Sequence, residues 1–453
     1  MCSKQMEATN REFKNKRMLP PCRAACPADV NVQGYIALLQ QGKFKESVEL
    51  VRQSIPFPAI CGRVCYSPCE DACARKNVDE PVSIRDLKWI IADIEREEGR
   101  VKPEPVPKTH SEKVAIVGAG PAGLTAAYEL AKLGYPVTVF EAMPKPGGTM
   151  LYFIPDSRLR KDVVANEVAY IQDLGVEIKT DVLFGRDLSL DSLRNDGYEA
   201  VFLAIGIQKV WKRKLASQDM PPLPDTLLNV EEDEDEVPTK LSTVWVDPLT
   251  LETRIPGVFA GGDILTGKAS GIVYAIGAGK QVAVSIDHYV NRRDLRIERE
   301  QKIEETTWVK DWERITKKPK RYIGPRTDIG KRRVSFEEAE EHLAKIKEAA
   351  IFEARRCLEC GPCVVCLGNK GLCEVDKAVV SETLCTGCNV CVVVCPFGAI
   401  KKNEMEIAEI DEDLCKGCGA CSASCPEQAI TMQRLTNAQI MINVVAALGG
   451  EFS

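Results

Sequence analysis

The chain has 453 residues, a formal net charge of −6 at pH 7 and an aromatic content of 6%. This length is enough for two to four domains with hydrophobic cores. The acidic balance argues against nucleic-acid binding as the main function, and the scarcity of aromatic residues argues against a surface on which bases stack. The segment 1–17 is almost wholly polar, and the longest apolar run, 440–448, is too short to span a bilayer, so we expect a cytoplasmic protein with no membrane span.

Residues 1–105 predict a helical iron–sulfur domain. Apolar residues recur at helical spacing over 32–50 and again over 82–98. With no export signal, the closely spaced thiols of this unit indicate metal ligands rather than disulfides. The cysteines follow a C-x3-C-P pattern and then a series with three residues between neighbours: Cys22, Cys26, Cys61, Cys65, Cys69 and Cys73.

Residues 106–295 predict a doubly wound α/β domain with a parallel sheet. After a Pro-rich linker at 101–107, a strand over 113–117, a glycine turn, a helix from about 122 to 133 and a strand over 136–141 form a βαβ unit. The domain is expected to close with 257–263 and a helix over 271–290.

The glycine turn reads Gly118-Ala-Gly120-Pro121-Ala122-Gly123. The first glycine allows the tight turn, the second lets the backbone approach a pyrophosphate, and the third permits close helix–strand packing. Glu141 ends the second strand 21 residues after Gly120, where a carboxylate can accept a hydrogen bond from a ribose 2′-hydroxyl. This fingerprint predicts a site for FAD or NAD, with the helix N-terminus facing the phosphates.

The second half of the chain predicts a charged linker with a helix, 296–352, an iron–sulfur region, 353–434, and a C-terminal helix, 435–453. The acidic run 231–236 is interpreted as a solvated loop. Two C-x2-C-x2-C-x3-C-P runs predict a ferredoxin-like α+β module with two [4Fe–4S] clusters, in which the fourth thiolate of each run binds the other run's cluster. The ligands are Cys385, Cys388, Cys391 and Cys395, followed by Cys415, Cys418, Cys421 and Cys425.

The stretch 22–290 resembles the small subunit of glutamate synthase and the related flavin modules of dihydropyrimidine dehydrogenase and electron-bifurcating transhydrogenases. The matching phrases are ICGRVC, the glycine turn, KPGG, LAIG and GVFAGGD, at 60–65, 118–123, 145–148, 203–206 and 257–263. The resemblance implies that this fold binds FAD and that Asp263 binds the ribityl or pyrophosphate region. It also implies that Gly147 and Gly148 line the cofactor, and that the helix near Gly271 directs its N-terminus at the isoalloxazine. Gly206 and Gly262, within the matching phrases, complete the predicted site.

The chain departs from that family between Gly206 and Gly257. The family inserts a second dinucleotide fold there, and a domain of that kind needs roughly 100 residues or more. Only 50 residues separate the two glycines here, and these residues contain no second glycine fingerprint. We therefore expect the usual NAD(P)H site to be absent.

The resemblance also implies that Cys26, Cys61, Cys65 and Cys69 complete one cluster. The phrase EARRCLEC, 353–360, resembles the segment that normally precedes this cysteine series, and it opens a middle group of Cys357, Cys360, Cys363, Cys366 and Cys373. Two arrangements are open. In the preferred one, four of these five thiols bind their own cluster or, alternatively, a zinc ion. In the other, Cys357 and Cys360 fold back to join Cys22 and Cys73.

These features predict an electron-transfer subunit of a multi-subunit oxidoreductase, with FAD and about four, or five, [4Fe–4S] clusters. The C-terminal arrangement is similar to the ends of heterodisulfide-reductase flavin subunits, which implies a catalytic partner. Candidate partners are a molybdenum or tungsten enzyme, a hydrogenase or a heterodisulfide-type reductase, and a free ferredoxin could exchange electrons with the chain. The alternatives are a self-contained NAD(P)H-dependent reductase of the glutamate synthase small-subunit type, and an assembly or anchoring protein with an empty flavin fold. No residue is predicted to catalyse chemistry on an organic substrate.

Overall fold

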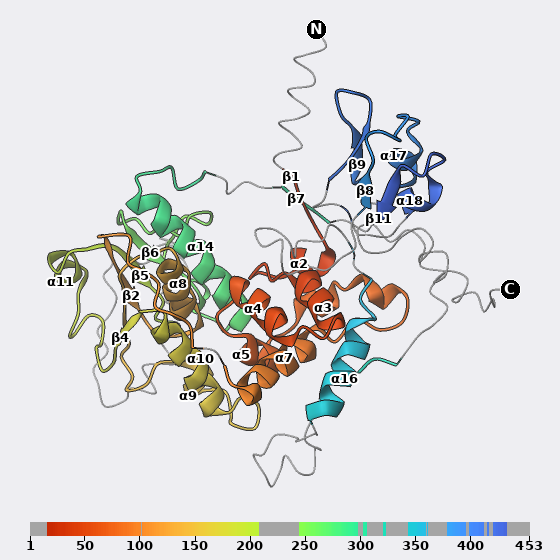
Figure 1. Ribbon diagram of the computed structural model, residues 1–453. Coiled ribbons are helices and arrows are strands. Elements are labelled where there is room, and N and C mark those ends of the chain that lie inside the picture. Colours follow the sequence, from red (N-terminus) through yellow and green to blue (C-terminus); the bar gives the residue numbers. More distant parts are fainter. Residues whose placement is uncertain are drawn as a thin grey trace, which may run out of the picture.

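A computed structural model describes residues 16–100, 102–207, 244–297, 302–305, 320–322, 343–358, 360, 378–395, 398–411, 415 and 420–432. Figure 1 shows the helical N-terminal part, the α/β part and the C-terminal module as separate groups of elements. Several predictions lie outside the described residues: the acidic loop, the C-terminal helix, Cys363, Cys366, Cys373 and Cys418.

The N-terminal part is helical, as predicted. The apolar stretch 32–50 forms two helices rather than one, because Gly42 adopts φ +74° just after the first helix and turns the chain. The elements are β1 (Lys16–Leu19), α2 (Pro21–Ala24), α3 (Val32–Gln40), α4 (Phe44–Ser54), α5 (Pro58–Val64), α6 (Pro68–Asp71), the 3-10 helix η1 (Ala74–Asn77) and α7 (Ile84–Glu98).

The central part has a parallel five-stranded sheet in the order β4-β3-β2-β5-β6, which confirms the predicted doubly wound fold. The order reverses direction at β2 and β5, so a crevice for ligands is expected at the carboxyl ends of these strands. The strands are β2 (Lys113–Val117), β3 (Val137–Phe140), β4 (Glu177–Lys179), β5 (Tyr198–Leu203) and β6 (Val258–Ala260). The helices are α8 (Pro121–Lys132), α9 (Gly148–Tyr152), α10 (Lys161–Asp173), α11 (Leu190–Asn195), α13 (Asp263–Thr266) and α14 (Ile272–Val290).

Two later segments return to the N-terminal part. Strand β7 (Lys302–Glu305) pairs in parallel with β1. Helix α16 (Leu343–Ala354) packs against α3 and α7 (Figure 1). The predicted boundary between linker and iron–sulfur region, at 352 and 353, therefore cuts a helix that packs on the N-terminal part.

The described residues of the C-terminal module form two antiparallel strand pairs and two short helices. Strand β9 (Ile400–Lys402) pairs with β10 (Ala408–Ile410), and β8 (Ala378–Val380) pairs with β11 (Ile430–Met432). The helices α17 (Val390–Val394) and α18 (Ala420–Ser424) each begin within one of the two cysteine runs. None of the helices in the described ranges is both long and apolar enough to cross a membrane.

Candidate cofactor cleft and iron–sulfur sites

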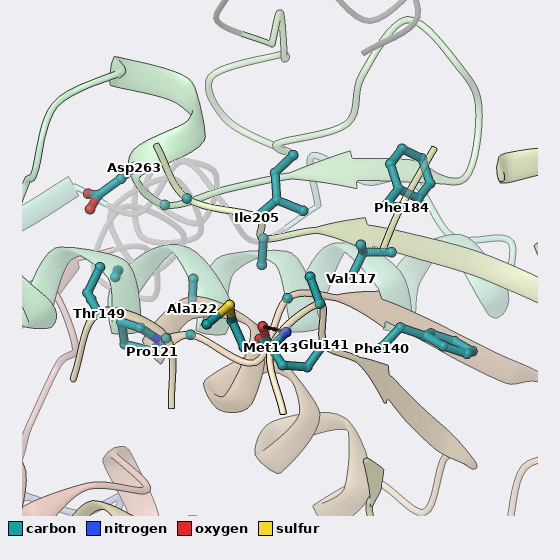
Figure 2. A pocket seen from close by; sticks show the side chains of 18 of the residues that line it. Val117, Pro121, Ala122, Phe140, Glu141, Met143, Thr149, Phe184, Ile205 and Asp263 are labelled. Carbon is teal, nitrogen blue, oxygen red and sulfur yellow. Dashed lines mark hydrogen bonds between the residues drawn. The ribbon is translucent and has the colours of Figure 1, made fainter. Parts of the chain in front are cut away.

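A cleft of about 900 Å³, including the solvent space at its mouth, lies at the carboxyl ends of β2, β3 and β5 (Figure 2). Nine of the twelve residues predicted for the flavin site line it: Gly118, Gly120, Pro121, Ala122, Glu141, Gly148, Gly206, Gly262 and Asp263. The other three do not line it directly. Gly123 packs under the turn, Gly147 precedes a lining glycine, and Gly271 begins α14, whose Ala275 reaches the cleft.

The glycine turn has the geometry that its sequence predicts. Gly118 has φ +107°, and a Cβ on it would lie 2.5 Å from the carbonyl oxygen of Ala204. A Cβ on Gly123 would lie 1.9 Å from the carbonyl oxygen of Gly118, so only glycine lets α8 begin this close to β2. By contrast, among the described residues no atom outside its immediate chain neighbourhood lies within 4 Å of the Cβ position of Gly120. The cleft is open at this glycine, where the fingerprint expects a pyrophosphate.

Glu141 is buried at the floor of the cleft, with 6% of its surface exposed. One carboxylate oxygen accepts from the backbone N–H of Ala119 at 2.7 Å and the other from the N–H of Met143 at 2.9 Å. Burial raises the pKa of Glu141, and these N–H groups offset part of that effect. The carboxylate is thus held in place beside the glycine turn, and its remaining lone pairs can accept from a sugar hydroxyl.

The two ends of the cleft differ in polarity. Figure 2 shows Asp263 and Thr149 at one end and Phe140, Phe184 and Val117 at the other. The Asp263 carboxylate accepts from the backbone N–H of Ser270 at 2.9 Å and from its hydroxyl at 2.5 Å. Sequence reasoning missed the apolar end, because these residues read only as strand and core residues.

The first cysteine group surrounds a buried lysine. Lys88, on α7, is 4% exposed, and burial disfavours its charged form. The sulfurs of four cysteines outweigh burial and raise the pKa of Lys88: Cys69, Cys61, Cys26 and Cys65. These are the four residues that the family resemblance groups together. The N–H of Ser67 also donates to the sulfur of Cys65 at 3.3 Å.

The remaining cysteines of the N-terminal part lie near the fold-back segment. Burial raises the pKa of Cys22, and so do the sulfurs of Cys357, Cys73, Cys69 and Cys360. Cys22 and Cys357 also pack against the same apolar core. The structure places Cys357 and Cys360 near Cys22 and Cys73, while Cys363, Cys366 and Cys373 of the self-contained middle group that we preferred lie outside the described residues. The EARRCLEC phrase is the sequence signal for this proximity, but the phrase alone does not show whether the chain folds back onto the N-terminal part.

In the C-terminal module, thiols from both cysteine runs line one small cavity of about 370 Å³, including open solvent. The lining includes Cys385, Cys388 and Cys391 from the first run and Cys425 from the second. This is the crossed ligand set that the tandem pattern predicts. Cys415 and Cys421 are buried in the same core, and the N–H of Ala399 donates to the Cys395 sulfur at 3.4 Å.

Among the described residues, no three His, Cys, Asp or Glu side chains are close enough together to hold a single metal ion. A [4Fe–4S] cube binds one thiolate at each of four corners, so its ligands stand farther apart than those of one ion. The chemistry of the donors, four thiolates in each group, fits such clusters.

Helix α14 connects the cysteine-bearing helices to the cleft, because it contacts both. Tyr66, next to Cys65, lies against the start of this helix, where a Cβ on Gly271 would be 2.6 Å from the tyrosine ring. Farther along, Lys280 Nζ donates to the carbonyl of Ala28 at 2.7 Å, two residues after Cys26. One helix therefore contacts residues beside the first cysteine group and also lines the predicted dinucleotide site.

A buried ion-pair network fixes the two parts together. Arg52, on α4, binds Glu167, on α10, at 3.0 Å and Glu95, on α7, at 2.6 Å. The Glu167 side chain has no exposed surface and also lies 3.3 Å from Arg100. Burial opposes the charge on Arg52, but Glu167 and Glu95 outweigh it and raise the pKa of Arg52.

Three family profiles match separate parts of the chain. Residues 4–100 match dihydropyrimidine dehydrogenase domain II with a 4Fe-4S cluster, residues 116–167 match an NAD(P)-binding Rossmann-like domain, and residues 378–432 match a 4Fe-4S dicluster domain. The predicted order of iron–sulfur, nucleotide-binding and iron–sulfur parts is confirmed. The middle profile covers the glycine turn and Glu141.

The chain is also similar to curated oxidoreductase subunits. It is 40% identical over 221 residues to the NADP(+)-dependent formate dehydrogenase subunit beta of Moorella thermoacetica, covering 44% of this chain and 31% of that protein. It is 41% identical over 191 residues to the NADPH-Fe(3+) oxidoreductase subunit beta of Geobacter sulfurreducens, covering 42% and 28%. It is 35% identical over 188 residues to the glutamate synthase [NADPH] small chain of Mycobacterium tuberculosis, covering 42% and 38%.

The chain spans less than half of the length of each of these relatives. Among solved structures, thioredoxin reductase from Lactococcus lactis aligns with 40% of this chain and 100% of its own at 13% identity, with a TM-score of 0.24. The sequence relatives and the profiles agree with the resemblance to glutamate synthase small subunits. The chain is homologous to glutamate synthase small-chain-like iron–sulfur oxidoreductase subunits, with iron–sulfur domains on both sides of a Rossmann-like domain.

Proposed function

We propose that this chain is an electron-transfer subunit of a multi-subunit oxidoreductase, with FAD in the cleft and [4Fe–4S] clusters on the cysteine groups. The observation that carries the proposal is the contact of α14 with both sites. Tyr66 and Ala28, each within two residues of a predicted cluster ligand, touch the helix that lines the cleft. A flavin and a cluster bound at these sites would be close neighbours.

The cleft suits FAD in three respects. The backbone at Gly120 leaves open space where a pyrophosphate can approach. Glu141 is positioned to accept from the ribose, and its negative charge disfavours a 2′-phosphate. The apolar end at Phe140 and Phe184 can cover an adenine ring, while the end at Asp263 offers polar groups to a ribityl chain or pyrophosphate.

The chain's own residues would hold and tune the cofactors rather than react. When bound, FAD exchanges electrons in pairs or singly, and each cluster exchanges one at a time. Lys88 places a positive charge among four predicted ligands, and the N–H groups of Ser67 and Ala399 donate to cysteine sulfurs. Such charges and hydrogen bonds set cluster potentials.

The substrate chemistry is proposed to occur on a partner subunit. Two of the relatives are named as beta subunits, which favours a complex, and the candidates are those given by the sequence: a molybdenum or tungsten enzyme, a hydrogenase or a heterodisulfide-type reductase. The proposed location is the cytoplasm, a reducing compartment in which closely spaced cysteines serve as metal ligands.

Anaerobic purification followed by a cofactor assay and redox titration tests the proposal. We expect one FAD and about 16 iron atoms per chain. We also expect a low-potential donor such as dithionite to bleach both chromophores, whereas NADH or NADPH alone leaves the flavin oxidised. Fast bleaching by NADPH in the isolated chain would instead establish the self-contained reductase. Iron without FAD would point to the assembly or anchoring alternative.

A further inference from the structure

The segment 343–360 folds back onto a part of the chain about 300 positions earlier. Helix α16 packs on α3 and α7, and Gln40 Nε2 donates to the carbonyl of Ala354 at 3.0 Å. Ala350 and Ala354 are fully buried in the core of the N-terminal part. The contact is therefore an integral part of that core.

A buried ion-pair network holds the end of α16. Glu353 has no exposed surface, and its two oxygens accept from the N–H groups of Ser83 at 2.9 Å and Tyr322 at 2.7 Å. Arg356, with a side chain 1% exposed, binds Glu353 at 2.7 Å and Asp79 at 2.9 Å. A buried guanidinium is tolerated only when it is paired in this way. The network thus specifies one position for the residue that follows Arg356.

That residue is Cys357, and the network brings it to the end of the first cysteine series. Arg75, two residues after Cys73, donates to the carbonyl of Arg356 at 3.3 Å and binds Asp79 through two hydrogen bonds of 2.6 and 2.7 Å. The side chain of Arg75, two residues after Cys73, is therefore hydrogen-bonded to the backbone just before Cys357.

Cys22 completes this arrangement. It begins the N-terminal group, lies in α2 next to α6 and packs against the same apolar core as Cys357. Cys73 belongs to that core, and Cys360 follows Cys357 by three residues. Three distant stretches of sequence thus bring three of these four thiols to the same core of the helical part.

We propose that Cys22, Cys73, Cys357 and Cys360 are the four ligands of one [4Fe–4S] cluster, with half of the ligands supplied from beyond the nucleotide-binding part. The proposal deepens the proposed function, because it adds a specific relay to the same chain. Four thiolates also suit zinc, but the neighbouring group around Lys88 and the looser spacing of these thiols favour an iron–sulfur cube.

The position of this cluster suggests which cofactors it would exchange electrons with. Cys69 lies near both cysteine groups, since its sulfur acts on Lys88 and on Cys22. Along the sequence, β8 of the C-terminal module begins at Ala378, eighteen positions after Cys360. The cluster would therefore adjoin the first group, whose neighbouring residues contact α14, and its last ligand would precede the ferredoxin-like module in the sequence.

Iron analysis of full-length alanine variants, loaded with clusters under anaerobic conditions, tests the proposal. Cys22→Ala and Cys357→Ala should each lower iron and acid-labile sulfide by about four atoms per chain. The double variant should lose the same four rather than eight, because both residues bind one cluster. Cys385→Ala combined with Cys22→Ala provides the reference for an additive loss, since these residues belong to different clusters.

Several results would overturn the proposal. Additive losses in the Cys22→Ala and Cys357→Ala double variant would place the two residues in separate sites. Full iron in Cys22→Ala with a loss in Cys363→Ala or Cys366→Ala would restore the self-contained middle group. Loss of one zinc in place of four irons would replace the cluster by a zinc site.

The flavin serves as the internal control. Retained FAD absorbance in the same samples shows that the variants still fold, so that an iron loss reports on the ligands. If the unsubstituted chain contains FAD and clusters but Cys22→Ala changes nothing, only the present inference fails. If the unsubstituted chain contains no FAD, the proposed function fails, while the iron counts still decide the ligand set.

Discussion

Replacing Arg356 by methionine perturbs the fold-back contact at its most buried point. Methionine is unbranched and occupies a similar path, but it leaves the carboxylate of Glu353 buried without its cation. Asp79 keeps its two hydrogen bonds from Arg75, so the damage is confined to the end of α16. The matched control is Lys347→Met on the same helix, which removes an ion pair with Glu98 whose side chains are 30% and 33% exposed.

The two substitutions should differ widely in cost. Breaking a buried pair by removing one partner costs about 3–5 kcal/mol, and the Arg356 and Glu353 side chains are only 1% and 0% exposed. A partly exposed pair contributes about 1 kcal/mol or less. At tenfold per 1.4 kcal/mol, opening of α16 should become at least about 100-fold more frequent in Arg356→Met and at most about fivefold more frequent in Lys347→Met.

Amide hydrogen exchange of the anaerobic holoprotein, followed by mass spectrometry of peptides from 343–356, measures this opening directly. We expect a large loss of protection in Arg356→Met and little change in Lys347→Met, with unchanged exchange in β2 and α8. Equal protection in the two variants would refute the reasoning, because it would mean that the buried network does not hold the segment.

Three further predictions concern the cleft and the first cysteine group. Gly123→Ala should abolish FAD binding while iron content is retained, because the new Cβ would meet the Gly118 carbonyl, and a yellow preparation with normal FAD would contradict this. Lys88→Met should lower the potential of one cluster by on the order of 100 mV in an EPR-monitored titration, since removal of a nearby buried positive charge disfavours reduction. An unchanged potential would show that the charge of Lys88 does not act on a cluster. Glu167→Ala should lower the free energy of unfolding by about 3–5 kcal/mol in anaerobic denaturant titrations, whereas Lys102→Ala, at a pair whose lysine is 73% exposed, should cost about 1 kcal/mol or less.

The sequence predicted best what depends on neighbouring residues. The turn from Gly118 to Gly123, its flanking strands and Glu141 form one continuous unit, in which glycine conformation and strand periodicity act locally. The position of Cys425 beside the thiols of the first ferredoxin run was also predicted, because tandem runs of this kind place the fourth cysteine of one run near the other run.

What the sequence did not predict depends on tertiary packing. The break at Gly42 was missed because apolar spacing continues on both sides of it. The destination of Cys357 was open because no local pattern records that Arg356 pairs with Asp79, almost 280 positions earlier. The apolar end of the cleft at Phe184 was missed for the same reason, since burial in a core and exposure to a cleft look alike in a sequence.

We propose that electrons move between the flavin and the clusters within this chain, through the first cysteine group. Stopped-flow mixing of the oxidised anaerobic holoprotein with a photoreduced ferredoxin, followed at the flavin and cluster absorbance, measures that transfer. The account predicts that cluster bleaching is followed by flavin bleaching, and that Cys61→Ala, which removes a ligand of the first group, slows the flavin phase at least tenfold while FAD stays bound. Flavin reduction at an unchanged rate in Cys61→Ala, or clusters that are reduced while the flavin stays oxidised, would contradict it.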